Sequence, residues 1–118
     1  MAKKSVEKGK RFERLLASKF REYGYDGARR TAQYCGNTGE AADVIGLPHI
    51  HVEAKHVEKL NIYDAVNQAK RDADAGGKGL IPVVFHKKNN HNILVTLELE
   101  NFMNIYREFE AGFREVEQ

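Results

Sequence analysis

The stretch from Ala42 to Lys55, ADVIGLPHIHVEAK, decides how the chain folds around its most unusual residues. A short apolar segment, 42–45, is followed by Gly46-Leu47-Pro48, whose residue types are typical of a turn. Residues 49–56 then alternate strictly between polar and apolar, which predicts a β-strand with one apolar face. We therefore expect the two segments to form a β-hairpin.

The polar face of this second strand carries charged side chains that are costly to bury. Glu53 and Lys55 share a face because side chains repeat every two residues along a strand, and the hairpin brings Asp43 across from them. Two neighbouring carboxylates can hold a hard divalent cation such as Mg²⁺, which would polarise a phosphate or a water. Lys55 could then orient that water or stabilise charge in the transition state. From the spacing alone, the alternative is a solvated strand face with an ion pair between residues two apart.

Length, charge and cysteine content limit what the chain can be. Its 118 residues suffice for one compact domain, so we expect residues 1–118 to form a single domain. The net charge is only +2, but the first thirty residues are basic and the end from Leu97 is acidic, which predicts one face that attracts an anion. The single cysteine, Cys35, excludes an internal disulfide. Together with a charged N-terminus and no long apolar run, this favours a cytoplasmic protein.

Periodicity and turn residues predict the other elements. The predicted helices are 6–23, 61–75 and 100–113, and the further strands are 28–34, 80–86 and 92–97. Residues 35–39 are expected to form a flexible glycine-containing loop. The order α-β-β-β-α-β-β-α indicates an α/β protein with a mixed central sheet flanked by helices. In the last helix, the predicted buried side consists of Phe102, Ile105, Tyr106 and Phe109.

In this order the chain resembles the PD-(D/E)xK nuclease superfamily, and within it the small Holliday junction resolvases of archaea and related phage nucleases. The matching pieces, which span about Lys8 to Glu100, are Lys8-Gly-Lys-Arg-Phe-Glu13, Asp43, Glu53-Ala-Lys55 and Gln68-Ala-Lys70. The resemblance implies a restriction-endonuclease-like core and a Mg²⁺-dependent endonuclease that hydrolyses DNA, for which Mn²⁺ would substitute. A Holliday junction is the first candidate substrate, and a phage-encoded protein would act in the host cytoplasm.

The resemblance also implies roles for individual residues. Asp43 and Glu53 match the family's metal ligands, and the main-chain carbonyl of Ala54 would be a further ligand. Lys55 matches the lysine that positions the attacking water. Glu13 matches an acid on the first helix that contributes through water or to a second metal.

A polar residue on the following helix, matched here by Gln68, supports the site in that family. Two departures accompany the match. Ala42 stands where the family has a proline, which leaves the carboxylate chemistry intact. The resolvases also place a small polar residue in the loop after the first strand, and either Asn37 or Thr38 would fill that position.

Basic residues crowd the first helix and the segment that leads into the sheet. We expect them to contact DNA phosphates, a sequence-independent contact that weakens with salt. These residues are Lys8, Lys10, Arg11, Arg14, Arg29 and Arg30. The alternative for the helix is a solvated face balanced by acidic neighbours, and for one of the two adjacent arginines it is an ion pair with Asp26.

Histidines and symmetry raise two further questions. His49 and His51 share the polar face of Glu53 and could hold zinc, but carboxylates suit a hard cation better, so we expect surface or DNA-facing histidines.

A four-way junction has two-fold symmetry, which favours a C2 homodimer built through the final helix or through strand 80–85. Two other functions stay open: a nuclease that prefers a flap, a nick or plain duplex, and a non-catalytic DNA-binding module on the same fold.

Overall fold

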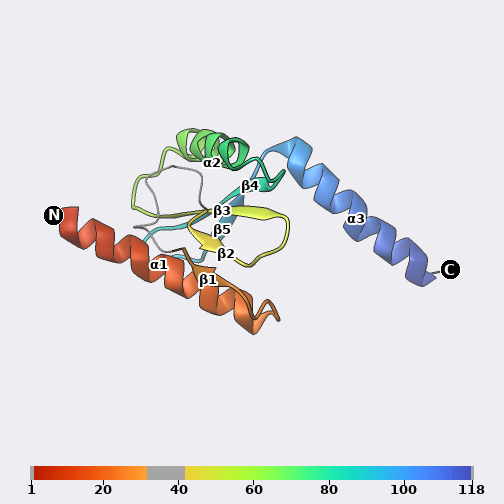
Figure 1. The fold of residues 1–118 in the computed structure, drawn as a ribbon, viewed down its shortest axis with the longest axis horizontal. Coiled ribbons are helices and arrows are strands. Elements are labelled where there is room, and N and C mark those ends of the chain that lie inside the picture. Colours follow the sequence, from red (N-terminus) through yellow and green to blue (C-terminus); the bar gives the residue numbers. More distant parts are fainter. Residues whose placement is uncertain (1, 32–41, 118) are drawn as a thin grey trace.

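A computed structural model describes residues 2–31 and 42–117 of the chain, and these form one sheet with helices on both of its faces (Figure 1). The elements follow in the order α1 (Ala2–Glu22), β1 (Arg29–Arg30), β2 (Val44–Ile45), β3 (Ile50–His56), α2 (Ile62–Gly76), β4 (Ile81–Lys87), β5 (Leu94–Thr96) and α3 (Leu99–Glu117). The sheet has the strand order β1-β2-β3-β4-β5. The predicted loop 35–39 and the end of the predicted strand 28–34 lie outside the described residues.

The sheet is mixed, as the sequence predicted. β2 and β3 form the expected antiparallel hairpin, with Val44 opposite Val52. β3 and β4 run parallel and are joined by α2, while β4 and β5 are antiparallel. The α/β class with a mixed five-stranded sheet flanked by helices is therefore confirmed.

Helix α1 covers one face of the sheet with large side chains. Its residues Phe12, Leu16 and Phe20 are buried against apolar side chains of the strands, among them Val52 and Phe85. The rings of Phe20 and Phe85 meet edge to face, with 5.3 Å between their centroids. Burial of such side chains contributes roughly 1.5–3 kcal/mol each, so this layer is the main hydrophobic core.

Helix α2 covers the opposite face with small side chains instead. Ala65 and Ala69 pack on Val84 of β4, and the short side chains let the helix lie close to the sheet. The helix starts at an Asn61 N-cap, whose side chain accepts the backbone N–H of Asp64, and it ends at Gly77 in the left-handed conformation. Both ends agree with the predicted helix 61–75. The close packing places the next α2 side chains directly over the polar face of β3.

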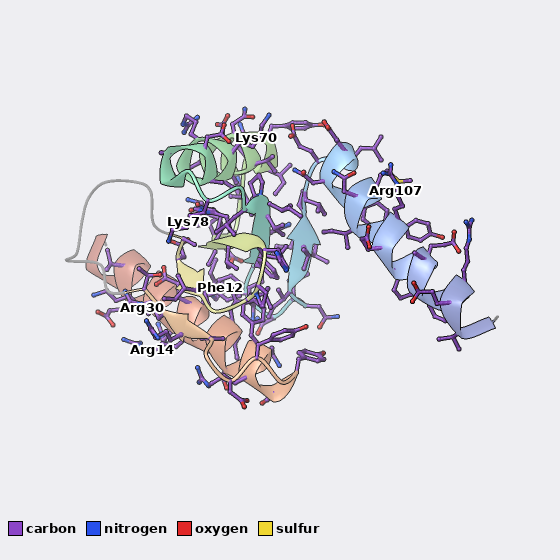
Figure 2. The ribbon with its side chains drawn as sticks, turned by 45° about the vertical axis from the view of Figure 1, so that its right-hand side comes forward. Phe12, Arg14, Arg30, Lys70, Lys78 and Arg107 are labelled. Atoms are coloured by element: carbon purple, nitrogen blue, oxygen red, sulfur yellow. The ribbon has the colours of Figure 1, made fainter. Side chains whose placement is uncertain are left out.

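The structure differs from the prediction mainly at the last helix. The four residues expected on a buried side of α3 are 39–61% exposed, and the side chains of this helix, Arg107 among them, stand clear of the sheet (Figure 2). A helical period shows that one face is apolar, but it does not show what covers that face. β4 also pairs on both sides, so the predicted strand 80–85 offers no open edge for a dimer. Among the described helices, none is long and apolar enough to cross a membrane.

The turn between β2 and β3 supplies a test of this packing. Gly46 has a φ of 95°, and a Cβ atom there would lie 2.5 Å from the carbonyl oxygen of Gly27. Gly46→Ala should therefore lower the free energy of unfolding by about 2 kcal/mol or more, as measured by urea denaturation. Gly9→Ala is the control, because a Cβ atom there meets nothing within 4 Å and alanine should stabilise α1 by up to ~1 kcal/mol. Equal stabilities for the two variants would contradict the close approach of this turn to Gly27.

Candidate metal centre

The hairpin brings Asp43 and Glu53 together. The pairing of Val44 with Val52 sets Asp43 opposite Glu53, and the backbone N–H of Asp43 donates to the Val52 carbonyl at 2.9 Å. The backbone N–H of Ala54 donates to Oδ2 of Asp43 at 2.8 Å. The carboxylate of Asp43 is therefore fixed by the backbone of β3, one residue beyond Glu53.

Lys55 lies beside this pair and is held by α2. Its Nζ is 3.7 Å from Oε2 of Glu53 and donates to Oε1 of Gln68 at 3.0 Å. Lys55 and Gln68 also line an open cavity of about 490 Å³, to which Asn67 and Arg71 contribute. The amine therefore stands between a buried carboxyl group and a groove large enough for a phosphate group.

Glu13 reaches the site from the opposite face of the sheet. Arg30 donates from Nε to Oε1 of Glu13 at 2.6 Å, so the partner of Arg30 is Glu13 and not Asp26. Burial raises the pKa of Glu13, and the negative charge of Asp43 raises it further. Glu13 is thus close enough to Asp43 to belong to the same group of charges.

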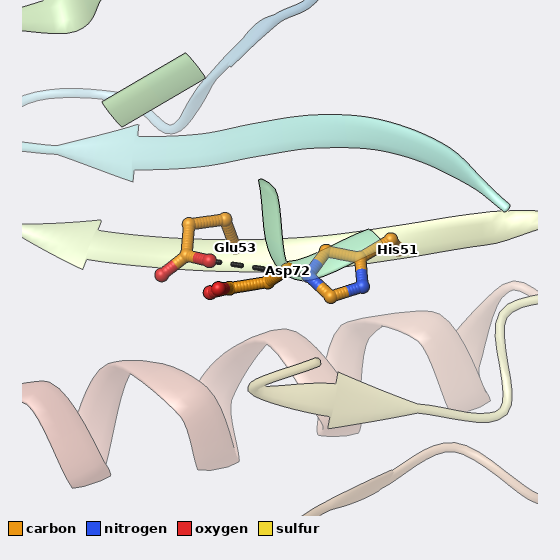
Figure 3. Close-up of side chains that lie close together, drawn as sticks. All are labelled: His51, Glu53 and Asp72. Atoms are coloured by element: carbon orange, nitrogen blue, oxygen red, sulfur yellow. Dashed lines mark ion pairs between the residues drawn. The ribbon is translucent and has the colours of Figure 1, made fainter. Parts of the chain in front are cut away.

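His51 and Asp72 complete a second side of the site. The donor atoms of His51, Glu53 and Asp72 all lie within 4.8 Å of one another (Figure 3). His51 is only 2% exposed, its Nε2 atom lies 4.0 Å from Oε1 of Glu53, and among the described residues that nitrogen has no hydrogen-bond partner. An orphaned buried nitrogen costs free energy, so this cluster is incomplete as a purely structural contact.

The burial of His51 corrects the prediction of a surface histidine. Helix α2 covers the polar face of the central strand β3, so a residue that alternation places on the polar side is nevertheless enclosed. His49 precedes the strand with a φ of 71° and is exposed, as predicted. Asp72 was missed by sequence reasoning, although its position one helical turn after Gln68 was a usable signal.

Burial dominates the electrostatics of the site. It raises the pKa of Glu53 to about 8, with a further increase from the charge of Asp43 and a partial decrease from Lys55. Burial also raises the pKa of Asp43, although the Ala54 N–H opposes the shift. The pKa of His51 is lowered by burial. At neutral pH Glu53 therefore holds a proton that a bound cation would displace.

The predicted DNA-contacting residues lie along α1 and β1. Arg11, Arg14 and Arg29 are exposed, whereas Lys8 has its Nζ 3.6 Å from Oε2 of Glu58. Lys8 and Arg11 line a cavity of about 560 Å³ on the α1 side of the sheet. The groove beside Lys55 is lined by α2 residues instead, so the basic residues and the lysine of the site are presented on different faces.

Arg71 is a further basic residue that sequence reasoning missed. It is exposed and lines the same cavity as Lys55 and Gln68, and it comes three residues after Gln68 on α2. That spacing places the two side chains on neighbouring positions of one helix face. Arg71 is therefore the described arginine nearest in the fold to the groove of the site.

Comparisons with protein-family models, with curated proteins and with solved structures give no match to this chain. The function of the site therefore has to be inferred from its own geometry. That geometry comprises a buried Glu53 beside a half-buried Asp43, a lysine held next to them and a histidine nitrogen that has no hydrogen-bond partner within residues 2–31 and 42–117.

The raised pKa of Glu53 predicts a pH-dependent stability of the metal-free protein. The folded state keeps this proton up to about pH 8, whereas the unfolded chain releases it near pH 4.5, so the free energy of unfolding should fall as pH rises between these values. Glu53→Gln should remove that contribution and be more stabilising at pH 8 than at pH 5.5, in urea titrations with EDTA. Glu100→Gln, at an exposed position on α3, is the control. An equal effect of Glu53→Gln at both pH values would show that Glu53 is already ionised at pH 5.5.

Proposed function

We propose that this chain is a metal-dependent DNA endonuclease that hydrolyses phosphodiester bonds, with branched DNA and first of all the Holliday junction as its substrate. The proposal extends to a restriction-endonuclease-like core of the PD-(D/E)xK type. The observation that carries it is the buried Glu53 beside the half-buried Asp43, with Nζ of Lys55 3.7 Å from Oε2 of Glu53 at the margin of an open groove. A binding module would gain nothing from burying two carboxylates where a phosphate has to approach.

The donor set fits a divalent cation. Two carboxylates side by side, desolvated and short of positive charge, are the oxygen ligands that Mg²⁺ prefers. In the proposed site Asp43 and Glu53 would hold the ion, the main-chain carbonyl of Ala54 would be a further ligand, and Glu13 would contribute through water. His51 Nε2, which has no hydrogen-bond partner in the described part of the chain, supports a second cation position that shares Glu53, because an ion bound by Glu53 and Asp72 would give that nitrogen a partner. A nitrogen donor is accepted more readily by Mn²⁺ than by Mg²⁺, which supports substitution by Mn²⁺.

The side chains around the metal position have separate tasks. A bound cation would supply a Lewis acid that polarises the phosphate and lowers the pKa of its water. Lys55 orients the attacking water and stabilises charge on the phosphate oxygens, and Gln68 keeps Lys55 in place through the 3.0 Å hydrogen bond. The water oxygen bonds to phosphorus while the bond to the leaving oxygen breaks. The water gives up one proton to solvent, and the leaving oxygen takes one up.

Affinity for DNA comes from basic residues outside the metal position. Arg71 lines the groove beside Lys55, where it can contact a phosphate that flanks the cleaved bond. The exposed arginines of α1 and β1, with Lys8 and Lys10, hold more distant phosphates on the other face. Such contacts are independent of sequence, and they suit an enzyme that recognises the shape of branched DNA.

Cleavage of a synthetic four-way junction tests the proposal directly. With Mg²⁺ the wild type should make paired cuts in the junction and leave a matched linear duplex intact, whereas EDTA should abolish cleavage. Lys55→Ala should slow cleavage by about a hundredfold or more, since it removes a charge that acts on the transition state. Lys59→Ala is the control, because Lys59 is exposed and lies outside the site.

Each alternative function gives a different result in that assay. Cleavage of flaps, nicks and duplex as well as junctions would keep the nuclease and remove the junction preference. Binding of DNA without cleavage in either Mg²⁺ or Mn²⁺ would replace the enzyme by a DNA-binding module on this fold.

Metal binding can be measured without DNA by calorimetry. Mg²⁺ or Mn²⁺ should bind the wild type and release protons at pH 7, seen as a heat that depends on the ionisation enthalpy of the buffer, because Glu53 must give up its proton. Glu53→Gln should abolish binding of both ions, and His51→Gln should weaken Mn²⁺ more than Mg²⁺. Glu58→Gln, an exposed acid beyond the end of β3, is the control. Binding that survives Glu53→Gln would place the ion elsewhere.

A further inference from the structure

Helix α3 presents an apolar face that its own domain leaves uncovered. Leu99 is 74% exposed, Phe109 61% and Phe113 55%. Their neighbours along the helix are exposed as well, namely Phe102, Met103, Ile105, Tyr106 and Val116. The helix projects from the edge of the sheet beyond β5 (Figure 1). A contiguous apolar face of this kind, exposed to water, marks an interaction site.

The spacing along α3 is that of a helix–helix seam. Leu99, Phe102, Tyr106, Phe109, Phe113 and Val116 follow one another at alternating steps of three and four residues. This is a heptad pattern with a period of 3.5, which keeps one narrow stripe in contact with a facing helix. An apolar seam between helices excludes charged residues from its contact positions. The charged residues of α3 all lie outside these six positions: Glu100, Arg107, Glu108, Glu110, Arg114, Glu115 and Glu117.

The aromatic rings of this seam already form a continuous row. Phe102 and Tyr106 stack with 6.0 Å between ring centroids, and Phe109 and Phe113 meet edge to face at 4.8 Å. Tyr106 and Phe109 bridge the two pairs at 6.3 Å. The row therefore presents a single aromatic surface along the helix, and its four residues are 45–61% exposed.

We propose that this seam binds the α3 helix of a second copy of the chain, so that the protein is a homodimer joined through paired α3 helices. A heptad stripe is self-complementary, and a two-fold axis matches the same patch on both subunits. Aromatic side chains bury on the order of 150–250 Å² each, so four half-exposed rings per helix give two copies roughly 600–1,000 Å². The exposed Leu99 and Val116 of each seam add to this area, toward the ~1,200 Å² of a small specific interface.

Charge argues against DNA as the occupant. Helix α3 carries five glutamates against two arginines, which makes it acidic, whereas phosphate contacts require basic residues. A partner protein with a basic groove would bind through these glutamates, and salt would weaken that contact. Two acidic helices that pair through an apolar seam should instead associate at least as well in high salt, since screening reduces their mutual repulsion.

Analytical ultracentrifugation of the full chain, without DNA or metal, tests the dimer. The wild type should sediment as a dimer at micromolar concentration, and Phe109→Glu should weaken the dimer at least about tenfold, because a charge in the seam cannot be desolvated. Glu108→Gln, one residue away but outside the seam, should leave the dimer intact. Sodium chloride at 1 M should not dissociate the wild type.

The outcomes are separable from those of the nuclease proposal. Because α3 packs on no other part of the described chain to a substantial extent, Phe109→Glu should keep the far-UV circular dichroism and the thermal transition of the domain. A second seam variant, Phe102→Ser, introduces no charge and should act in the same direction. A monomeric wild type, a dimer that survives both variants, or a dimer dissolved by salt would each overturn the proposal.

Discussion

The burial of Glu53 beside Asp43 is the constraint on which the rest of the site depends. Glu53 is 4% exposed, and Lys55, whose Nζ lies 3.7 Å from its Oε2, also donates a hydrogen bond to Gln68. Burying a carboxyl group beside a second one is costly, and Lys55 offsets that cost only in part, so the pKa of Glu53 rises to about 8. The surrounding structure tolerates this because the Ala54 N–H fixes Asp43 and because α2 seals the face with alanines.

That constraint also explains why the two helices are so different. Helix α1 meets the sheet with Phe12, Leu16 and Phe20, and this layer supplies most of the hydrophobic stabilisation. Helix α2 buries only small side chains on Val84, and its neighbouring positions hold Gln68 and Asp72 over the polar face of β3. One face of the sheet therefore provides stability, and the opposite face carries the groups whose burial the stable face has to offset.

Local patterns predicted the parts of this arrangement that depend on neighbours in sequence. Strict alternation identified the β3 strand and the pairing of Glu53 with Lys55 on one face, and the Gly46–Pro48 turn identified the hairpin that adds Asp43. The same patterns could not predict the burial of His51, which depends on α2 lying over a central strand. They also failed for α3, because a helical stripe is the same whether its own domain or a second copy covers it. Which element covers a given face depends on how the layers assemble, and no periodicity in the sequence indicates it.

The positions of the carboxyl pair and of α3 in the sheet make the two proposals compatible. The carboxyl pair lies between β2 and the central strand β3, whereas α3 follows β5 at one edge of the sheet. In the proposed dimer the α3 seam and the residues that line the groove beside Lys55 are separate sets, so each subunit would keep its own proposed metal centre. Two equivalent strands of a symmetric DNA branch also lie apart, so two cuts need two separated centres related by the same two-fold axis. The residues proposed for association therefore belong to α3, and those proposed for cleavage belong to β2, β3 and α2.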